Sequence, residues 1–286
     1  MPLSRRLPPA PSLLRPLPRP VPGRQAAAVG PLARGRVPRP DRWLALVLVA
    51  LLGAGATPWA RAASPSAAQL QALETALNGT DPAALQALLG EGPGIDAGLL
   101  QRRWSALRQA FPDARWQLTP GTPTQKGQPT VNLRVIASRV DGSVTYRLTG
   151  DQLLELRSDG RRISGQNLLR EQTILRSGDS DLPVSVLIPD AVLTGQRYDV
   201  DVIFDEPLSG ALVAGGIQAL TSQQVAAMES PAIELAALGG GGLFKSVRAP
   251  YSPGSQTWAV LLVHPRGVVT ATKRVRVVAD RAALQP

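Results

Sequence analysis

The sequence contains no cysteine and a single histidine, His264. Without cysteine the chain has no disulfides, thiol nucleophiles, zinc ribbons, iron–sulfur clusters or lipoprotein anchors. One histidine excludes a metal site of several histidines and leaves one position for a histidine-based catalytic triad. We therefore expect no metal site, no cofactor and no catalytic residue of these classes.

Acidic residues are scarce at the amino-terminal end. The 286 residues carry a formal charge of +10, and residues 1–62 hold ten arginines and one acidic residue, Asp41. The remaining 224 residues hold 21 basic and 20 acidic residues, so their net charge is close to zero. A nucleic-acid-binding domain needs a basic face of its own, and these totals give no support for one. We expect no nucleic-acid partner.

The long apolar run of the leader occupies residues 43–60, which carry no charge and lie between Arg42 and Arg61. A basic segment, a short apolar core and the small-residue site Ala60-Arg61-Ala62 are typical of a secretory signal peptide. An uncleaved membrane anchor is the alternative, because 18 residues is the lower limit for crossing a bilayer. Residues 43–62 therefore predict export to the periplasm or the thylakoid lumen, or anchoring by residues 43–60.

Residues 1–42 contain 11 prolines and nine arginines, and they have too little apolar surface to fold. We expect this segment to be disordered. Signal peptides have a brief basic lead, and a start at Val37 gives 26 residues to Ala62. We therefore expect translation to begin at Val37 and the mature chain to begin at Ala63. A disordered cytoplasmic arm on an anchored protein is the rival hypothesis.

Three helical patterns open the next region. The first has leucines at i, i+3 and i+7 and ends at Asn78-Gly79, and the second begins at Asp81-Pro82 and continues to residue 89. The third starts near residue 96, and its apolar stripe consists of Leu100, Trp104, Leu107 and Phe111. Such a stripe is more typical of core packing than of a ligand site.

Four to six antiparallel strands are predicted after these helices. A short strand surrounds Trp116, and residues 131–136 and 144–148 alternate between apolar and polar side chains. Asp141-Gly142 and Asp159-Gly160 are hairpin turns, and residues 163–175 form the last long strand. Residues 66–178 thus predict an α+β domain.

This order of elements resembles the nuclear transport factor 2-like superfamily, also called SnoaL-like. The opening helix, the helix at residues 81–89, the segment at residues 159–163 and the long closing strand carry the resemblance, which covers about 110 residues. It implies a strongly curved antiparallel sheet that wraps a long helix into a cone with one open end. The chain is also similar to secreted cyanobacterial proteins in which such a cone precedes a β-domain.

The resemblance implies a cavity for a small organic molecule, into which enzymatic members place an Asp, His or Tyr. Here residues 66–178 have no histidine, and the aspartates fall at predicted caps and turns, with Asp151 at a break after Gly150. Glu155 and Glu171 are the strand carboxylates. A buried glutamate gains a raised pKa suited to proton transfer, whereas Glu171 beside Arg170 is more typical of a surface pair.

Residues 182–280 predict an immunoglobulin-like β-sandwich, because about seven short apolar runs alternate with turn signals. The runs lie at 183–188, 197–204, 210–217, 232–235, 243–247, 257–263 and 268–278. Residues 222–228 predict a helical turn. We interpret the carboxylates Asp199, Asp201, Asp205 and Glu206 as a solvated face rather than a calcium site.

We expect an exported two-domain α+β protein without catalytic chemistry. It binds a small apolar ligand in the cone or docks to envelope proteins through the sandwich, and it meets the membrane only through its leader. The residues expected to contact a ligand are Trp104, Trp116, Tyr146 and Glu171. The alternative is a SnoaL-like isomerase, dehydratase or hydrolase acting on a small organic molecule. An ionisable side chain in the cone cavity distinguishes the two classes.

Overall fold

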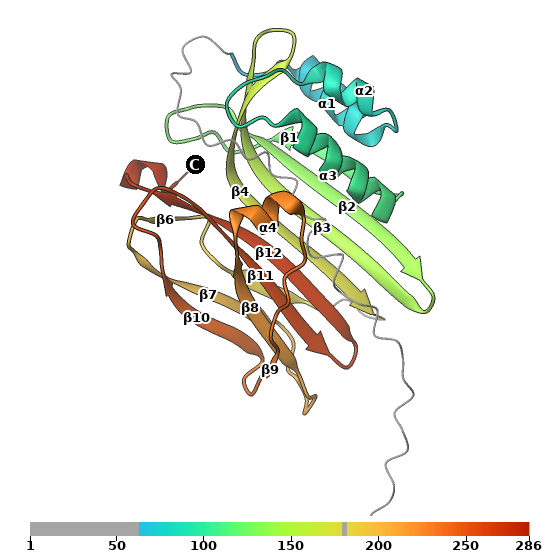
Figure 1. The fold of residues 1–286 in the computed structure, drawn as a ribbon, viewed down its shortest axis with the longest axis vertical. Coiled ribbons are helices and arrows are strands. Elements are labelled where there is room, and N and C mark those ends of the chain that lie inside the picture. The colour runs from blue at the N-terminus through green and yellow to red at the C-terminus, as the bar shows by residue number, and fades with distance from the viewer. Residues whose placement is uncertain (1–62, 179–181, 286) are drawn as a thin grey trace, which may run out of the picture. The chain divides into compact units, whose positions relative to one another are not determined.

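A computed structural model describes residues 63–178 and 182–285 of the chain. The described part is an α+β structure built mostly from antiparallel strands (Figure 1). The predicted disordered leader (1–42), the signal peptide or anchor (43–62) and the start at Val37 lie outside the described residues. Within these ranges no helix is both long enough and apolar enough to cross a membrane.

Three helices come first, as the sequence predicts: α1 (Ala67–Asn78), α2 (Pro82–Leu88) and α3 (Ala97–Ala110). Each begins at a side chain that caps a free backbone N–H group, and these caps are Ser66, Asp81 and Asp96. The helices pack their apolar stripes against one face of the following strands (Figure 1), with Leu85 and Leu107 fully buried.

Four antiparallel strands follow: β1 (Arg115–Pro120), β2 (Val131–Asp141), β3 (Val144–Ser158) and β4 (Ile163–Gly178). The predicted Asp-Gly turns join β2 to β3 and β3 to β4, and Gly142 and Gly160 have positive φ angles. The prediction of a break at Asp151 is wrong. Strand β3 passes through this residue without interruption, because Asp151 pairs with Arg134 of β2 on one side and Gln172 of β4 on the other, and its side chain lies on the outward face.

The described carboxyl-terminal part contains strands of two to twelve residues and one short helix. Their bounds are β5 (Val184–Leu187), β6 (Ala191–Leu193), β7 (Arg197–Phe204), β8 (Ala214–Leu220), α4 (Ser222–Ala227), β9 (Ala236–Ala237), β10 (Gly242–Arg248), β11 (Gly254–His264) and β12 (Gly267–Val278). A 3₁₀ turn at Arg281–Ala283 follows. The predicted helical turn is confirmed as α4. The predicted strand at 232–235 is wrong, because that segment has no ladder and pairing begins only at β9.

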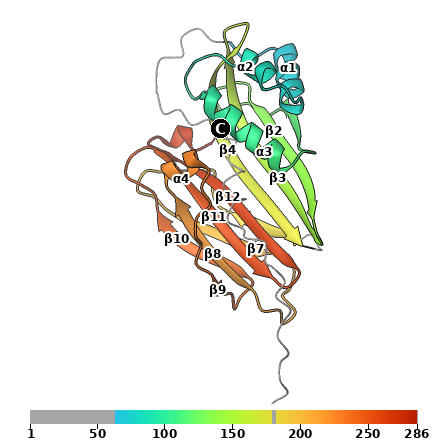
Figure 2. The same cartoon turned by 45° about the vertical axis from the view of Figure 1, so that its right-hand side comes forward.

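Two sheets organise the described residues. Nine strands form the larger sheet in the order β1-β2-β3-β4-β12-β11-β8-β9, with β6 also paired to β12. Strands β10, β7 and β5 form the smaller sheet. The two sheets enclose a second apolar core in which Val200 and Val202 of β7 meet Val260 and Leu262 of β11. Figure 2 shows β7 and β10 alongside β8, β11 and β12.

We expected residues 66–178 and 182–280 to form separate domains, but strands from both segments belong to the larger sheet. Strand β4 pairs with β12 from Glu171–Arg274 to Gly178–Gly267, so the hydrogen-bonded ladder passes from one segment into the other. Each segment keeps its own apolar cluster. The pairing of β4 with β12 places two features at the junction: a buried polar row and an open polar hollow.

Candidate functional site

The three aromatic residues predicted to contact a ligand are buried in the helix-facing core. Trp104, Trp116 and Tyr146 are only 3–4% exposed. The indole Nε1 of Trp104 donates a hydrogen bond to the backbone oxygen of Leu77 at 2.9 Å. The guanidinium of Arg108 lies 5.7 Å from the Trp104 ring and 5.5 Å from the Trp116 ring. These contacts are those of a packed core with a stacked arginine.

Trp104 also borders a hollow of about 420 Å³ on the helical side. Its other lining residues are Thr80, Pro82, Ser105, Arg108, Gln109 and Pro112. Tyr146 is not one of them; the Arg139 guanidinium lies 5.0 Å from its ring, and burial raises the pKa of its hydroxyl. The structure thus separates Tyr146 from this hollow.

Glu171 lies in a buried polar row across the centre of the larger sheet. The cross-strand register places Gln152 of β3, Glu171 of β4 and Arg274 of β12 side by side. Gln152 donates a hydrogen bond from Nε2 to Glu171 Oε1 at 2.7 Å. Glu171 is 2% exposed, so its interpretation as a surface pair with Arg170 is wrong. Alternation explains the error, because neighbouring strand residues point to opposite faces.

Helix α3 covers this row and contributes a second cation. Arg103 is 1% exposed, and its Nη2 atom donates to the backbone oxygen of Val225 in α4 at 2.9 Å. Burial raises the pKa of the Glu171 carboxyl, while the charges of Arg274 and Arg103 and the hydrogen bond from Gln152 act in the opposite direction. Burial lowers the pKa of Arg274. The arrangement ties α3 and α4 to the sheet and offers a reactant almost no access to the carboxyl.

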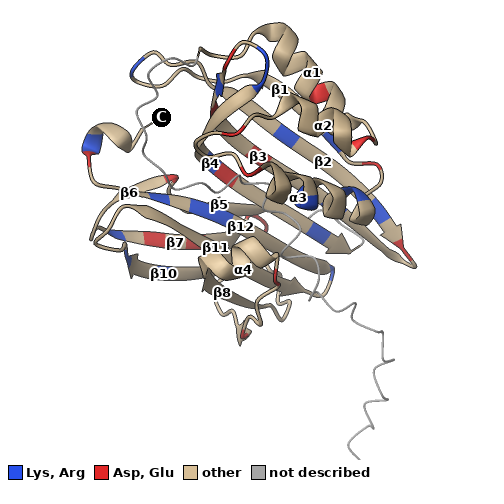
Figure 3. Cartoon of the chain, turned by 45° about the horizontal axis from the view of Figure 1, so that its top comes forward, with Lys and Arg blue, Asp and Glu red and all other residues tan. Residues whose placement is uncertain are grey.

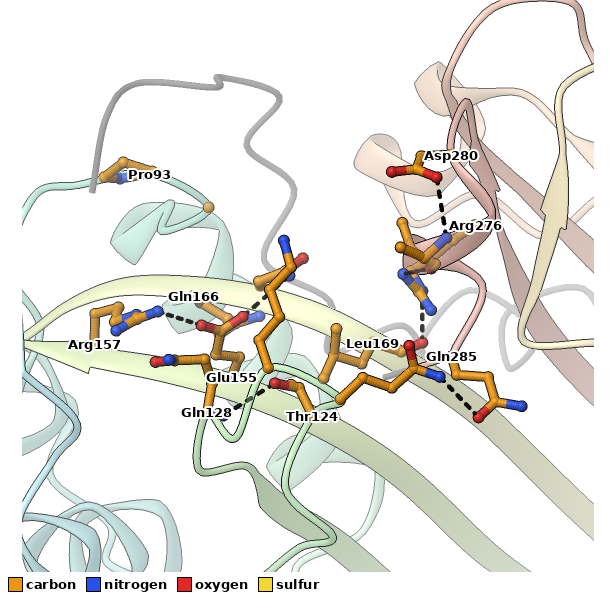
Figure 4. Close-up of a pocket in the computed structure, with 16 residues that line it drawn as sticks. Pro93, Thr124, Gln128, Glu155, Arg157, Gln166, Leu169, Arg276, Asp280 and Gln285 are labelled. Carbon is orange, nitrogen blue, oxygen red and sulfur yellow. Dashed lines mark hydrogen bonds and ion pairs between the residues drawn. The ribbon is translucent and has the colours of Figure 1, made fainter. Parts of the chain in front are cut away.

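The second feature is a polar hollow of about 610 Å³ in the wedge where β4 and β12 separate (Figure 4). The β4–β12 ladder ends at Glu171–Arg274, and a register shift between Leu153 and Leu154 marks the adjacent β3–β4 ladder. Beyond that point β12 pairs with β6 instead. The lining residues are Pro93, Gly94, Thr124, Gln125, Lys126, Gln128, Glu155, Arg157, Gln166, Asn167, Leu169, Arg276, Asp280, Ala282, Ala283 and Gln285.

Segment 90–95 closes one end of the hollow by lying along the outer edge of β4. Gly90 N–H donates to Ile163 O at 2.8 Å, and Gln166 N–H donates to Pro93 O at 2.9 Å. A Cβ atom at Gly94 would collide with the carbonyl oxygen of Gln166, and Gly94 has a φ of 78°. Only glycine permits this close approach without strain. The edge of β4 is therefore covered up to Gln166, and the hollow opens beyond it.

Most charges in the hollow are already satisfied by the protein. Arg276 donates to three backbone oxygens, those of Leu169, Ala283 and Leu284, at 2.9–3.3 Å, and so holds the carboxyl-terminal segment in place. Glu155 pairs with Arg157 (Figure 4). Five amide side chains also line the hollow, from Gln125, Gln128, Gln166, Asn167 and Gln285. Such a lining suits hydroxyl and amide groups better than a net charge.

The sequence did not predict the hollow, because its lining residues come from five segments that are far apart in the chain. Gly165 was the one sequence feature that could have indicated an irregularity here, since a glycine inside a predicted strand often marks a bulge. Among the described residues no group of three or more His, Cys, Asp or Glu is arranged to hold a metal ion. Of the four acidic residues considered for calcium, Glu206 pairs with Arg266 at 2.6 Å.

Residues 179–278 match a family model described as a domain of unknown function, DUF8623. The match covers β5 to β12, which includes the whole smaller sheet and the half of the larger sheet that faces it. The helices α1–α3 and strands β1–β4 lie outside the match. No curated protein matches the chain.

Proposed function

We propose that this protein is a non-catalytic binding protein whose ligand occupies the hollow between β4 and β12. The observation that carries the proposal is the contrast between the two polar features at the junction. Glu171 is sealed beneath α3, whereas the hollow is open and its amides face a volume of about 610 Å³. A hollow of this size fits a small organic molecule.

The chemistry of the lining favours a neutral ligand rich in hydroxyl or amide groups, such as a saccharide or a short peptide. Side-chain amides both donate and accept, so they pair with either group. The expected apolar ligand inside the cone has less support. Trp104, Trp116 and Tyr146 are buried members of one apolar cluster, and they pack against other side chains of that cluster.

A cone and a sandwich remain our proposals for the two halves of the fold. Three helices that pack on one face of four antiparallel strands support a nuclear transport factor 2-like relationship. Two sheets packed through a shared apolar core support an immunoglobulin-like sandwich. We also propose export, on the sequence of residues 43–62, and docking to an envelope protein through the smaller sheet, where Leu187 and Phe244 are 56% and 63% exposed.

An acid–base enzyme is the second candidate function, because burial raises the pKa of Glu171. Its weakness is geometric: a general base must come within hydrogen-bonding reach of its substrate, and Glu171 already accepts from Gln152 beside Arg274. A Glu171→Gln variant that abolished turnover of a small molecule while leaving its binding intact would favour the enzyme.

The binding proposal is tested by saturation-transfer NMR of the full chain with a panel of neutral saccharides and dipeptide amides. We expect at least one compound to bind and the double variant Gln125→Ala/Asn167→Ala to lose at least tenfold in affinity, because two lining amides are removed. The matched control is Gln109→Ala/Gln117→Ala, which removes two exposed amides elsewhere. Equal losses in both variants, or no binding of any compound, would overturn the proposal.

A further inference from the structure

Residues 280–285, which follow β12, form one wall of the hollow, and we call them the wall segment. Four of them are among its lining residues: Asp280, Ala282, Ala283 and Gln285. The segment is shaped by the 3₁₀ turn at Arg281–Ala283, which begins where Asp280 accepts a hydrogen bond from Ala282 N–H at 3.1 Å. Figure 3 shows this turn beside the label C, outside both sheets.

Polar contacts hold the wall segment in place. Arg276 donates from Nη1 to Ala283 O at 3.1 Å and from Nη2 to Leu284 O at 3.3 Å. Across the hollow, Gln125 donates from Nε2 to Gln285 Oε1 at 3.2 Å. Neither apolar cluster found among the described residues includes a member of the wall segment, and Gln285 is exposed. Displacing the segment therefore costs hydrogen bonds that water can replace, and little apolar burial.

The two donors, by contrast, are fixed by contacts that do not involve the wall segment. Arg276 lies in β12 between β11 and β6, and its Nε donates to Leu169 O at 2.9 Å. Gln125 belongs to a turn that is closed by a hydrogen bond from Gly127 N–H to Thr124 O at 2.8 Å. The donors are thus positioned independently of the segment that they hold.

The contacts of the wall segment indicate which chemistry the hollow recognises. Arg276 donates to two successive backbone carbonyl oxygens, and a guanidinium offers its N–H groups in a fixed fork. Gln125 donates to a side-chain amide. Successive carbonyl groups of this kind are a property of peptides. No aromatic side chain is among the residues that line the hollow, so a sugar ring would find no flat apolar surface there.

On the basis of the proposed function, which places a ligand in this hollow, we propose that the ligand is a peptide and that it displaces the wall segment from Arg276 and Gln125. The wall segment acts as an intramolecular competitor, because it occupies both donors until a peptide replaces it. The affinity of the hollow for a peptide is therefore lowered by the fraction of molecules in which the segment is in place.

The test titrates the ¹⁵N-labelled full chain with an unlabelled synthetic peptide that has the sequence of residues 279–285 and is blocked at both ends. The loosened variant is Asp280→Ala/Gln285→Ala, which removes the cap of the turn and the side-chain contact across the hollow and leaves both donors intact. The control is Asp199→Ala/Gln109→Ala, which makes the same substitutions at two exposed positions elsewhere. The two variants therefore have equal net charge.

We expect the loosened variant to bind the peptide about tenfold more tightly than the wild type and the control, because two hydrogen bonds of the competitor are lost. Peptide binding to the wild type should also accelerate hydrogen exchange at the amides of Ala283 and Leu284, which are hydrogen-bonded within the turn. Adding Arg276→Lys to the loosened variant should remove most of the gain, because an ammonium group does not reproduce the forked pair of donors. Unchanged melting temperatures exclude unfolding as the cause.

Equal affinities of the loosened variant and the control would overturn this proposal, as would peptide binding that leaves exchange at Ala283 and Leu284 unchanged. A saccharide that binds the wild type, together with no peptide binding by either variant, would overturn the peptide ligand and leave the proposed function standing. No binding of the peptide or of any neutral compound would overturn both.

Discussion

At the scale of single residues, Glu171 shows how a polar group is held inside this protein. Its carboxyl accepts a hydrogen bond from Gln152, and the charges of Arg274 and Arg103 favour its ionised form. Burial acts more strongly in the opposite direction and raises its pKa. A buried charge of this kind stabilises a fold only where its partners are complete, and removing one partner is destabilising.

A pH dependence follows from the direction of this pKa shift. A carboxyl whose pKa is higher in the folded than in the unfolded chain favours folding most below the unfolded pKa, and this contribution is lost as the pH rises through the folded pKa. We therefore expect the stability of the wild type relative to Glu171→Gln to fall as the pH rises from about 4, near the ordinary pKa of a glutamate, towards alkaline values. Urea unfolding across this range measures the difference. A difference that stayed constant or grew with pH would contradict the shift.

At the scale of elements, helix α1 covers the outer edge of β1. Asn78 accepts a hydrogen bond from Trp116 N–H at 3.0 Å and donates to Trp116 O at 2.8 Å, and Glu74 accepts from Leu118 N–H at 2.7 Å. An uncovered edge strand would present these groups to other chains. Two side chains of α1 thus replace a neighbouring strand.

Removing this cover has a measurable consequence. We expect Asn78→Ala to lower the free energy of unfolding by about 1–3 kcal/mol, because both backbone groups of Trp116 lose their partner. Hydrogen exchange of the Trp116 amide should accelerate in parallel. Gln71→Ala, at an exposed position of α1, serves as the control. Equal stability and equal exchange in the two variants would show that the contact contributes little.

At the scale of the whole described structure, the larger sheet connects two apolar cores. The β4–β12 ladder and the hydrogen bond from Arg103 to Val225 both cross between residues 63–178 and 182–285. The match to a family model begins at residue 179. The amino-terminal boundary of the matched region therefore falls between strands that belong to one continuous sheet. Strand β12 lies inside the matched region, and it pairs with β4, which lies outside that region.

We expect this connection to make the two cores unfold together, because opening one would expose the β4–β12 ladder. Hydrogen exchange monitored by mass spectrometry in increasing urea should show peptides from β2 and from β7 losing protection at one denaturant concentration. Peptides from the two halves with separate midpoints would contradict this expectation. They would show that each apolar cluster is stable without the other.

The sequence by itself determined the features that depend on neighbouring residues. Caps at Ser66, Asp81 and Asp96 begin the first three helices, and aspartate–glycine pairs form the hairpin turns, because these interactions span only a few residues. The absence of cysteine likewise excluded disulfides and thiol chemistry from composition alone.

Only the tertiary structure decided which strands meet. Alternation shows that Glu171 and Arg170 point to opposite faces, but the choice of the buried face depends on where α3 packs. The pairing of β4 with β12 joins residues about a hundred positions apart, and no local signal encodes it. The polar hollow arises from that packing and pairing, since it gathers side chains that are distant in sequence and adjacent only in the folded chain.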